Sequence, residues 1–244
     1  MKGQAHEIDR VYGIDDPEGR ASLWKLLSQL RHSSRWTFRH SIRVGRLARD
    51  FARYLGASEK AAGNLGLAVA CHDVGKMCIP AEILDKTDRL TPEEVKLIGS
   101  HPELGRRMLE EDTHILPRLA ALISEGHDKH ARTDLPLGAQ MASFCDVFDS
   151  KTSSRPYRRE AHTTYRTLKD ILRDKRLIGN PGMMEDFVLF CLGAFRRTLE
   201  EERRFLPPST PPLTPESVKE MVADRQARQA GVSPPARDPV KPRQ

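Results

Sequence analysis

The chain has 244 residues, of which 38% are hydrophobic and 30% are charged, and its formal net charge is +6. This length and a mean hydropathy of −0.56 predict one well-buried core, and no apolar run approaches the roughly 20 residues of a transmembrane helix. Because the first residues also lack the apolar stretch of a secretory signal, we expect a cytoplasmic protein with no membrane partner. Basic residues are interleaved with acids, which indicates solvated helix faces and argues against a nucleic-acid partner, whereas an anionic small substrate is compatible with the charge.

Helical spacing of apolar residues dominates the chain, and no segment alternates in the manner of a β-strand. The run Thr91-Pro92-Glu93-Glu94 is a strong helix start, since it combines a threonine N-cap, a proline at the first helical position and a glutamate that closes a capping box. The pattern predicts an all-α fold. In chain order, the expected helices cover Ala21–Leu30, Thr37–Leu55, Ser58–Asp73, a segment beginning at Pro92, Pro102–Glu110, His114–Glu125, Leu137–Ser150, Thr163–Asp174 and Met183–Arg204.

The composition changes near the C-terminal end. Nine of the 17 prolines lie between Pro207 and Pro242 among few large apolar residues, and such a segment is typical of disorder. Thr214-Pro215-Glu216 could open a short helix there, with only a weak apolar patch behind it. We therefore expect an N-terminal extension at 1–19, a helical-bundle domain at 20–206 and a disordered tail at 207–244.

The pair His72-Asp73, followed by Lys76, is the most informative feature of the sequence. The pair ends a run of small apolar residues, where an imidazole and a carboxylate are costly to bury unless something satisfies them. A divalent metal would do so. The alternative is that both groups bond to nearby backbone, and the dipeptide alone does not decide between the two.

Four more side chains could join this pair from different predicted helices, as happens when a helical bundle builds a metal site in its interior. Asp146 is the clearest of them, because an unpaired carboxylate on a largely apolar helix would carry a heavy desolvation penalty. His40 lies on an apolar stripe, where a histidine bonded within the core is the alternative. The six candidate metal ligands are His40, His72, Asp73, His101, His127 and Asp146.

The order of these residues resembles the HD-GYP branch of the HD metal-dependent phosphohydrolase superfamily. The similarity is most specific in His72–Pro80, Ile83–Lys86, Leu90–Glu94 and Asp146–Tyr157, and it extends over roughly Phe38–Arg159. It implies an all-helical HD domain that holds two, sometimes three, metal ions and hydrolyses cyclic di-GMP.

The resemblance also implies a role for each matching residue. One metal would be held by His40, His72, Asp73 and Asp146, and Asp73 would bridge to a second metal supported by His101 and His127. Asp73 and Lys76 would take part directly in catalysis, and the substrate phosphate would be contacted by Lys76, Arg155 and Arg158.

The chain departs from the family pattern in three places. Gly126-His127-Asp128 stands where the family has paired histidines before an acidic residue, the Gly-Tyr-Pro loop is missing, and Trp36 occupies the position of an acidic ligand in members with three metals. A third metal is therefore not expected.

Imidazoles and carboxylates without a thiolate favour iron, manganese or zinc over magnesium or calcium. Two such ions would activate a hydroxide for attack on phosphorus. We therefore expect a metal-dependent phosphohydrolase with two divalent ions, and cyclic di-GMP is the best single substrate. One alternative is a degenerate HD-GYP signalling module that binds nucleotide or a partner protein without catalysis; another is an HD phosphohydrolase acting on a different nucleotide. Each of these three functions is compatible with a signalling partner protein or with a homodimer.

Overall fold

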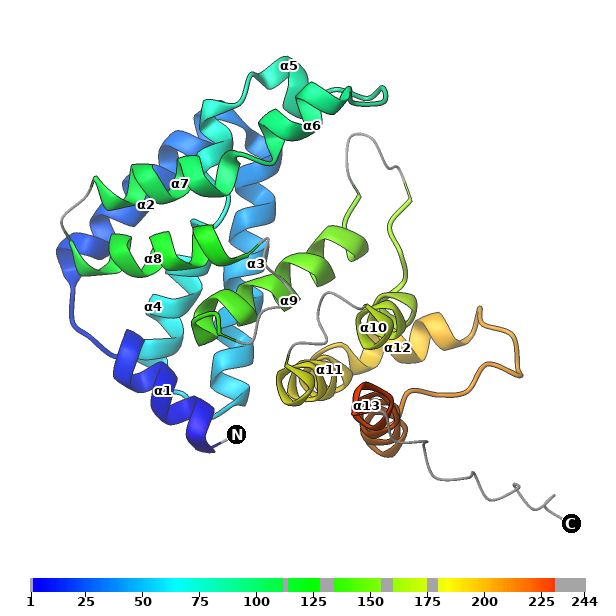
Figure 1. Cartoon of the computed structure of the whole chain (residues 1–244). Coiled ribbons are helices and arrows are strands. Elements are labelled where there is room, and N and C mark those ends of the chain that lie inside the picture. Colours follow the sequence, from blue (N-terminus) through cyan, green and yellow to red (C-terminus); the bar gives the residue numbers. More distant parts are fainter. Residues whose placement is uncertain (1, 112–113, 128–133, 155–159, 175–179, 231–244) are drawn as a thin grey trace, which may run out of the picture.

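The computed structural model describes residues 2–111, 114–127, 134–154, 160–174 and 180–230 (Figure 1). Every regular element in these residues is helical, which confirms the predicted all-α class. None of these helices combines the length and apolar character that crossing a membrane requires. The elements are α1 (Lys2–Tyr12), α2 (Pro17–Ser33), α3 (Arg35–Tyr54), α4 (Glu59–Ala70), the 3-10 turn η1 (Val74–Cys78), α5 (Ala81–Leu84), α6 (Pro92–Ile98), α7 (His101–Glu110), α8 (Ile115–Gly126), α9 (Leu137–Thr152), α10 (Thr164–Arg173), α11 (Pro181–Ala194), α12 (Arg196–Arg203) and α13 (Pro215–Gln229).

Side-chain caps fix where the central helices begin. The Ser34 hydroxyl accepts a hydrogen bond at the start of α3, and Ser58 does the same at the start of α4. Thr91 and Glu94 form the predicted capping box of α6. These bonds satisfy backbone N–H groups that have no partner within the helix. The caps therefore fix the residue at which each helix begins, and with it which side chains face the core.

Helices α3 and α4 cross at a pair of glycines near the centre of the molecule. A Cβ atom on Gly45 would lie 2.5 Å from the carbonyl oxygen of Gly66, and one on Gly66 would lie 2.7 Å from that of Gly45, so a larger residue cannot be accommodated. Helix α3 also packs against α2, α9 and α11. Fully buried side chains such as Val44, Phe51 and Phe187 fill the surrounding core. The crossing therefore holds α3 and α4 firmly together.

Both terminal segments contribute helices to the core. Helix α1, which periodicity did not predict, packs against α4 and buries Ile8 and Tyr12. The short helix that Thr214-Pro215-Glu216 could open is present as α13, which packs against α11 and buries Val218 and Val222, so the expected disorder of 207–244 does not hold for Pro215–Gln229. Two valines one turn apart suffice when a neighbouring helix offers them an apolar face. Residues 231–244 lie outside the described part, and the domain boundaries at 19/20 and 206/207 remain predictions.

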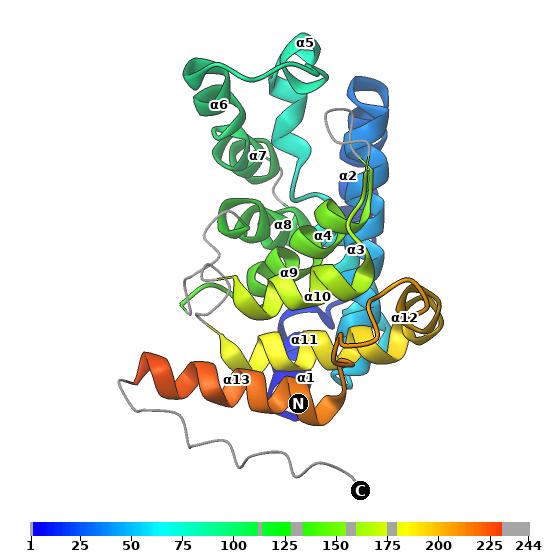
Figure 2. The same cartoon turned by 90° about the vertical axis from the view of Figure 1, so that its right-hand side faces the viewer.

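The predicted helix Met183–Arg204 is two helices, since the backbone turns at Phe195 between α11 and α12. Figure 1 shows α5 and α6 at one end of the molecule, and Figure 2 shows α10, α11 and α13 stacked toward the other end. The predicted helix Ser58–Asp73 ends at Ala70, so that His72 and Asp73 lie in the turn that follows it.

Candidate metal centre

The six predicted ligands come together in the interior of the bundle. Five of them are buried, and about a fifth of the Asp146 side chain is exposed. They reach the centre from five places in the fold: His40 from α3, His72 and Asp73 from the turn after α4, His101 from the first residue of α7, His127 from the C-cap of α8, and Asp146 from α9.

Asp73 lies between two groups of imidazoles, each of which could hold a metal ion with it. Its Oδ2 atom is 3.7 Å from Nε2 of His40 and 3.6 Å from Nε2 of His72. Its Oδ1 atom is 3.2 Å from Nε2 of His101 and 3.9 Å from Nε2 of His127. The two oxygens of one carboxylate therefore face different groups, which is the arrangement of a bridging ligand.

The backbone sets the proton positions of three of these rings. In each, Nδ1 lies within hydrogen-bond distance of the carbonyl oxygen three residues earlier. A carbonyl only accepts, so Nδ1 carries the hydrogen and Nε2 keeps a lone pair directed at the centre. The three bonds join His72 to Val69 (2.9 Å), His101 to Ile98 (2.6 Å) and His127 to Ser124 (2.9 Å).

This arrangement leaves polar atoms that need a cation. The Nε2 atoms of His101 and His127 are 3.1 Å apart, although the Nδ1 bonds leave neither with a hydrogen to donate. Among the described residues, Nε2 of His72 and Oδ1 of Asp73 are buried without a hydrogen-bond partner. Burying such atoms unsatisfied costs a few kcal/mol each. The donor set, nitrogen and carboxylate oxygen only, therefore fits divalent metal ions.

Two of the predicted ligands, His72 and Asp73, are also held in the protonation states that metal binding requires. Burial lowers the pKa of His72 to about 4, so its ring is neutral at pH 7. Burial acts to raise the pKa of Asp73, but Lys76 and the neighbouring imidazoles outweigh this effect and hold it well below its usual range. Both groups therefore offer lone pairs without first losing a proton.

His40 lies between two carboxylates. Its Nδ1 is 2.7 Å from Oδ2 of Asp149, and its Nε2 is 3.0 Å from Oδ1 of Asp146. Burial lowers the pKa of His40, but these two hydrogen bonds outweigh burial and raise it to about 9. The ring is therefore protonated at neutral pH without a metal, and a metal ion bound at Nε2 would have to displace that proton. Arg43 clamps Asp149 through two hydrogen bonds of 2.7 and 2.9 Å. Asp149 thus orients the His40 ring, as a carboxylate behind a metal-bound histidine does.

We expect Asp149→Asn to weaken metal binding by about tenfold or more, because it removes the charge that orients and polarises His40. Metal titration of chelator-treated protein, followed by calorimetry, measures this change. Asp170→Asn is the matched control, since Asp170 pairs with Lys151 instead. Unchanged affinity in the Asp149 variant would show that His40 needs no such support.

Asp146 completes the group around His40. Besides its contact with His40, its Oδ1 is 4.0 Å from Nε2 of His72. Burial acts to raise the pKa of Asp146, but the hydrogen bond from His40 and the charge of nearby imidazoles lower it, so the group is a carboxylate at neutral pH. Because part of its side chain is exposed, Asp146 lies where the candidate metal centre opens to solvent.

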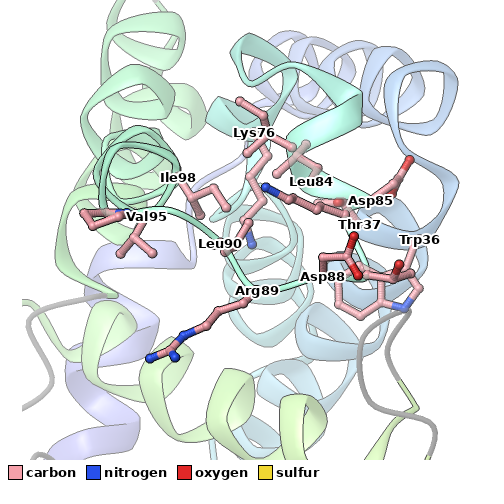
Figure 3. A pocket seen from close by; sticks show the side chains of 14 residues that line it. Trp36, Thr37, Lys76, Leu84, Asp85, Asp88, Arg89, Leu90, Val95 and Ile98 are labelled. Carbon is pink, nitrogen blue, oxygen red and sulfur yellow. The ribbon is translucent and has the colours of Figure 1, made fainter.

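A cleft of about 1080 Å³ adjoins the centre (Figure 3). Lys76 lines it and places its ammonium 2.6 Å from Oδ2 of Asp73. Trp36 lines it as well and stacks on the His40 ring, with centroids 5.5 Å apart and planes 11° apart. Two residues that line the cleft, Lys76 and Trp36, therefore contact predicted metal ligands directly.

Several sequence expectations fall outside the described residues. The predicted phosphate contacts Arg155 and Arg158 are among them, and so is Asp128, which follows His127 where the chain departs from the family pattern. Gly126 itself is described: a Cβ there would lie 2.5 Å from Cβ of Ala139. Position 126 therefore has no room for a second histidine side chain.

Sequence reasoning did not find Arg43 or Ser124. Arg43 follows His40 by three residues, and Asp149 follows Asp146 by three, so both lie one helical turn along from a predicted ligand. That spacing was the available signal. The buried Ser124 hydroxyl lies 3.1 Å from the carbonyl oxygen of His72 and 3.2 Å from that of Pro102, and nothing local in the sequence indicates this link.

Comparison with known proteins agrees with this geometry. Residues 25–177 match the family described as HD domain. The chain belongs to the HD domain family. This HD domain is 34% identical over 142 residues to the cyclic di-GMP phosphodiesterase PA4108 of Pseudomonas aeruginosa, an alignment that covers 54% of this chain and 34% of the relative.

Two further relatives carry related names. A cyclic di-GMP phosphodiesterase of Thermotoga maritima is 33% identical over 148 residues, covering 56% of this chain and 39% of the relative. The 3'3'-cGAMP-specific phosphodiesterase 2 of Vibrio cholerae is 27% identical over 146 residues, covering 56% of this chain and 28% of the relative. The HD domain chain thus spans about a third of the length of these relatives.

Proposed function

We propose that this HD domain is a metal-dependent phosphodiesterase that hydrolyses a cyclic dinucleotide, with cyclic di-GMP as its first candidate substrate. The observation that carries the proposal is the position of Asp73 between two groups of imidazoles whose Nε2 lone pairs face the same space. The names of the similar proteins support the reaction class and suggest two candidate substrates, cyclic di-GMP and 3'3'-cGAMP.

Each residue has a role under this proposal. His40, His72, Asp73 and Asp146 would hold one ion, and Asp73, His101 and His127 would hold a second. Divalent iron, manganese or zinc bound there would supply Lewis-acid chemistry and a water molecule of lowered pKa.

The side chains around the cleft would handle the substrate. Lys76, about a fifth exposed, can turn its ammonium from Asp73 toward a non-bridging phosphate oxygen. Asp149 would keep His40 oriented. Arg155 and Arg158 stay predicted phosphate contacts.

The test is turnover by metal-loaded protein. We expect protein reconstituted with manganese or iron to cleave cyclic di-GMP, and the chelator-treated protein to lose at least 99% of that rate, since metal activation of water is worth many powers of ten. Liquid chromatography of the products separates the linear dinucleotide from mononucleotide. The same assay with 3'3'-cGAMP and a nucleotide panel ranks the substrates.

The outcomes distinguish the alternative functions. Cleavage of another nucleotide in place of a cyclic dinucleotide would assign a different HD phosphohydrolase activity. Nucleotide binding without turnover by a protein carrying its full metal complement would instead indicate a signalling module that has lost catalysis. The proposal fails in either case.

A further inference from the structure

A second cavity lies along α2, α3 and α4, and it shares no lining residue with the cleft at the metal centre. It is a groove of about 330 Å³ and is called the arginine groove here. Helix α2 lines it with residues 20 and 24, α3 with residues 42, 45, 46 and 49, and α4 with residues 63, 66, 67 and 70. In α3 and α4 this spacing is that of one helix face over about two turns, roughly 10 Å.

The arginine groove carries positive charge. Arg20, Arg46 and Arg49 line it and are exposed, and no carboxylate is among its described lining residues. Arg46 has no hydrogen-bond or ion-pair partner in the part of the chain that the structure describes. Arg49 pairs with Asp50, but both side chains are 45% exposed, and a pair of this kind is weak enough to be exchanged for another. The groove therefore attracts an anionic partner.

Arg20 is held in place by a buried amide. Its guanidinium donates a hydrogen bond of 2.5 Å to Oδ1 of Asn64. The Nδ2 group of Asn64 in turn donates to the carbonyl oxygens of Tyr12 and Ile14, at 2.8 and 2.9 Å. Because asparagine is neutral, it orients the guanidinium without cancelling its charge. Less side-chain freedom is then lost when a ligand binds Arg20.

Small residues of α3 and α4 form much of the groove. Gly45 and Gly66 are required by the crossing of α3 and α4, since a Cβ on either would overlap the other's backbone. Gly63 has no such reason, because a Cβ there would meet nothing within 4 Å. Glycine within a helix is nevertheless destabilising relative to alanine. A partner whose backbone lies against α4 at this position would explain the glycine, since close approach of a backbone favours it.

We propose that the arginine groove binds an acidic amphipathic helix of a partner protein. Carboxylates one turn apart on such a helix would meet Arg46 and Arg49, and an apolar residue between them would pack on Leu67 and on Trp24, which is 52% exposed. Tryptophan and arginine are the residues that most often anchor protein interfaces. The glycines allow the helix axes to approach closely.

The proposed interaction is independent of the proposed phosphodiesterase function, because no metal ligand lines the groove. It is nevertheless placed on the helices that build the metal centre. Helix α3 carries His40, and α4 ends two residues before His72. A partner bound there would contact both helices.

The experiment selects binders from a phage-displayed library of helical peptides, with one face randomised over acidic, basic and apolar residues. The target is the full chain, and fluorescence anisotropy gives the affinity of each enriched peptide. Arg46→Glu reverses one charge of the groove, and Arg31→Glu makes the same change at an exposed α2 position outside it. Gly63→Phe fills the groove, and Gln29→Phe adds the same ring elsewhere on α2. Circular dichroism checks that all four variants are folded.

We expect the enriched peptides to carry carboxylates one helical turn apart. Their affinity should fall about tenfold in Arg46→Glu, because reversal replaces attraction by repulsion, and at least as much in Gly63→Phe. The two control variants should change it by less than about twofold, since they lie outside the contact. The measurements need neither metal nor turnover, so they stand whether or not the protein is a phosphodiesterase.

Several results would overturn the proposal. Enriched peptides that are neutral or basic would do so, and so would equal losses in Arg46→Glu and Arg31→Glu, which would indicate attraction to net charge alone. Selection of no peptide that responds to Gly63→Phe would also do so. Calorimetric binding of inorganic phosphate that Arg46→Glu abolishes would instead assign a small-anion site. A dimer in sedimentation that Gly63→Phe abolishes would assign the groove to a second copy of this chain.

Discussion

Asp73→Ala is expected to remove all tightly bound metal, from about two ions per chain in the wild type to none, and with them all hydrolytic activity. The reason is that Asp73 contributes an oxygen to both groups of imidazoles, so one substitution empties both sites. Elemental analysis of protein purified without added metal, normalised to chain concentration, measures the change.

The control for this prediction is Asp50→Ala, which removes an exposed α3 carboxylate that pairs with the adjacent Arg49. It should retain the full metal content. Circular dichroism of both variants checks that the helices are intact. Equal metal content in the Asp73 variant and the wild type would contradict the bridging role.

Gly75→Ala should lower the free energy of unfolding by about 3 kcal/mol. A Cβ atom on Gly75 would overlap the carbonyl oxygen of His101 and the backbone nitrogen of Gly105, so η1 and α7 would have to move apart. Because these are backbone atoms, no rotamer change relieves the overlap. Urea titration of chelator-treated protein isolates this effect from metal binding.

Gly63→Ala is the matched control, because a Cβ there meets nothing within 4 Å. Within α4 this substitution should raise the free energy of unfolding by up to about 1 kcal/mol, since alanine loses less backbone entropy than glycine. The free energy of unfolding is therefore expected to fall in the Gly75 variant and to rise in the Gly63 variant. A small effect at Gly75 would show that the contact between η1 and α7 is loose.

The helices around the site were predictable because their apolar residues repeat with a clear period and their starts carry strong caps. Ser58 and the capping box at Thr91 are examples, and both bonds are present. The start of α13 was signalled in the same way by Thr214-Pro215-Glu216. Its packing was not, because Val218 and Val222 form a stable face only when α11 lies beside them.

The candidate ligands could be chosen from residue type, burial pattern and the resemblance to HD-GYP proteins, and the structure brings them together. Their division into two groups was not, because only the tertiary structure places the two oxygens of Asp73 toward different histidines. Support from Arg43 depends likewise on a contact between α3 and α9. The break at Phe195 shows a related limit, since Gly193 lies two residues before it but a single glycine within a helical pattern does not by itself mark a helix end.

Three of the imidazoles take their orientation from carbonyl groups at the C-terminal ends of α4, α6 and α8. Those ends carry partial negative charge, and the carboxylates of Asp73 and Asp146 add to it. These carbonyl ends and carboxylates attract a cation and, against the single ammonium of Lys76, disfavour an anion at the centre. We therefore expect a divalent cation to bind first and to make the later binding of an anionic ligand more favourable.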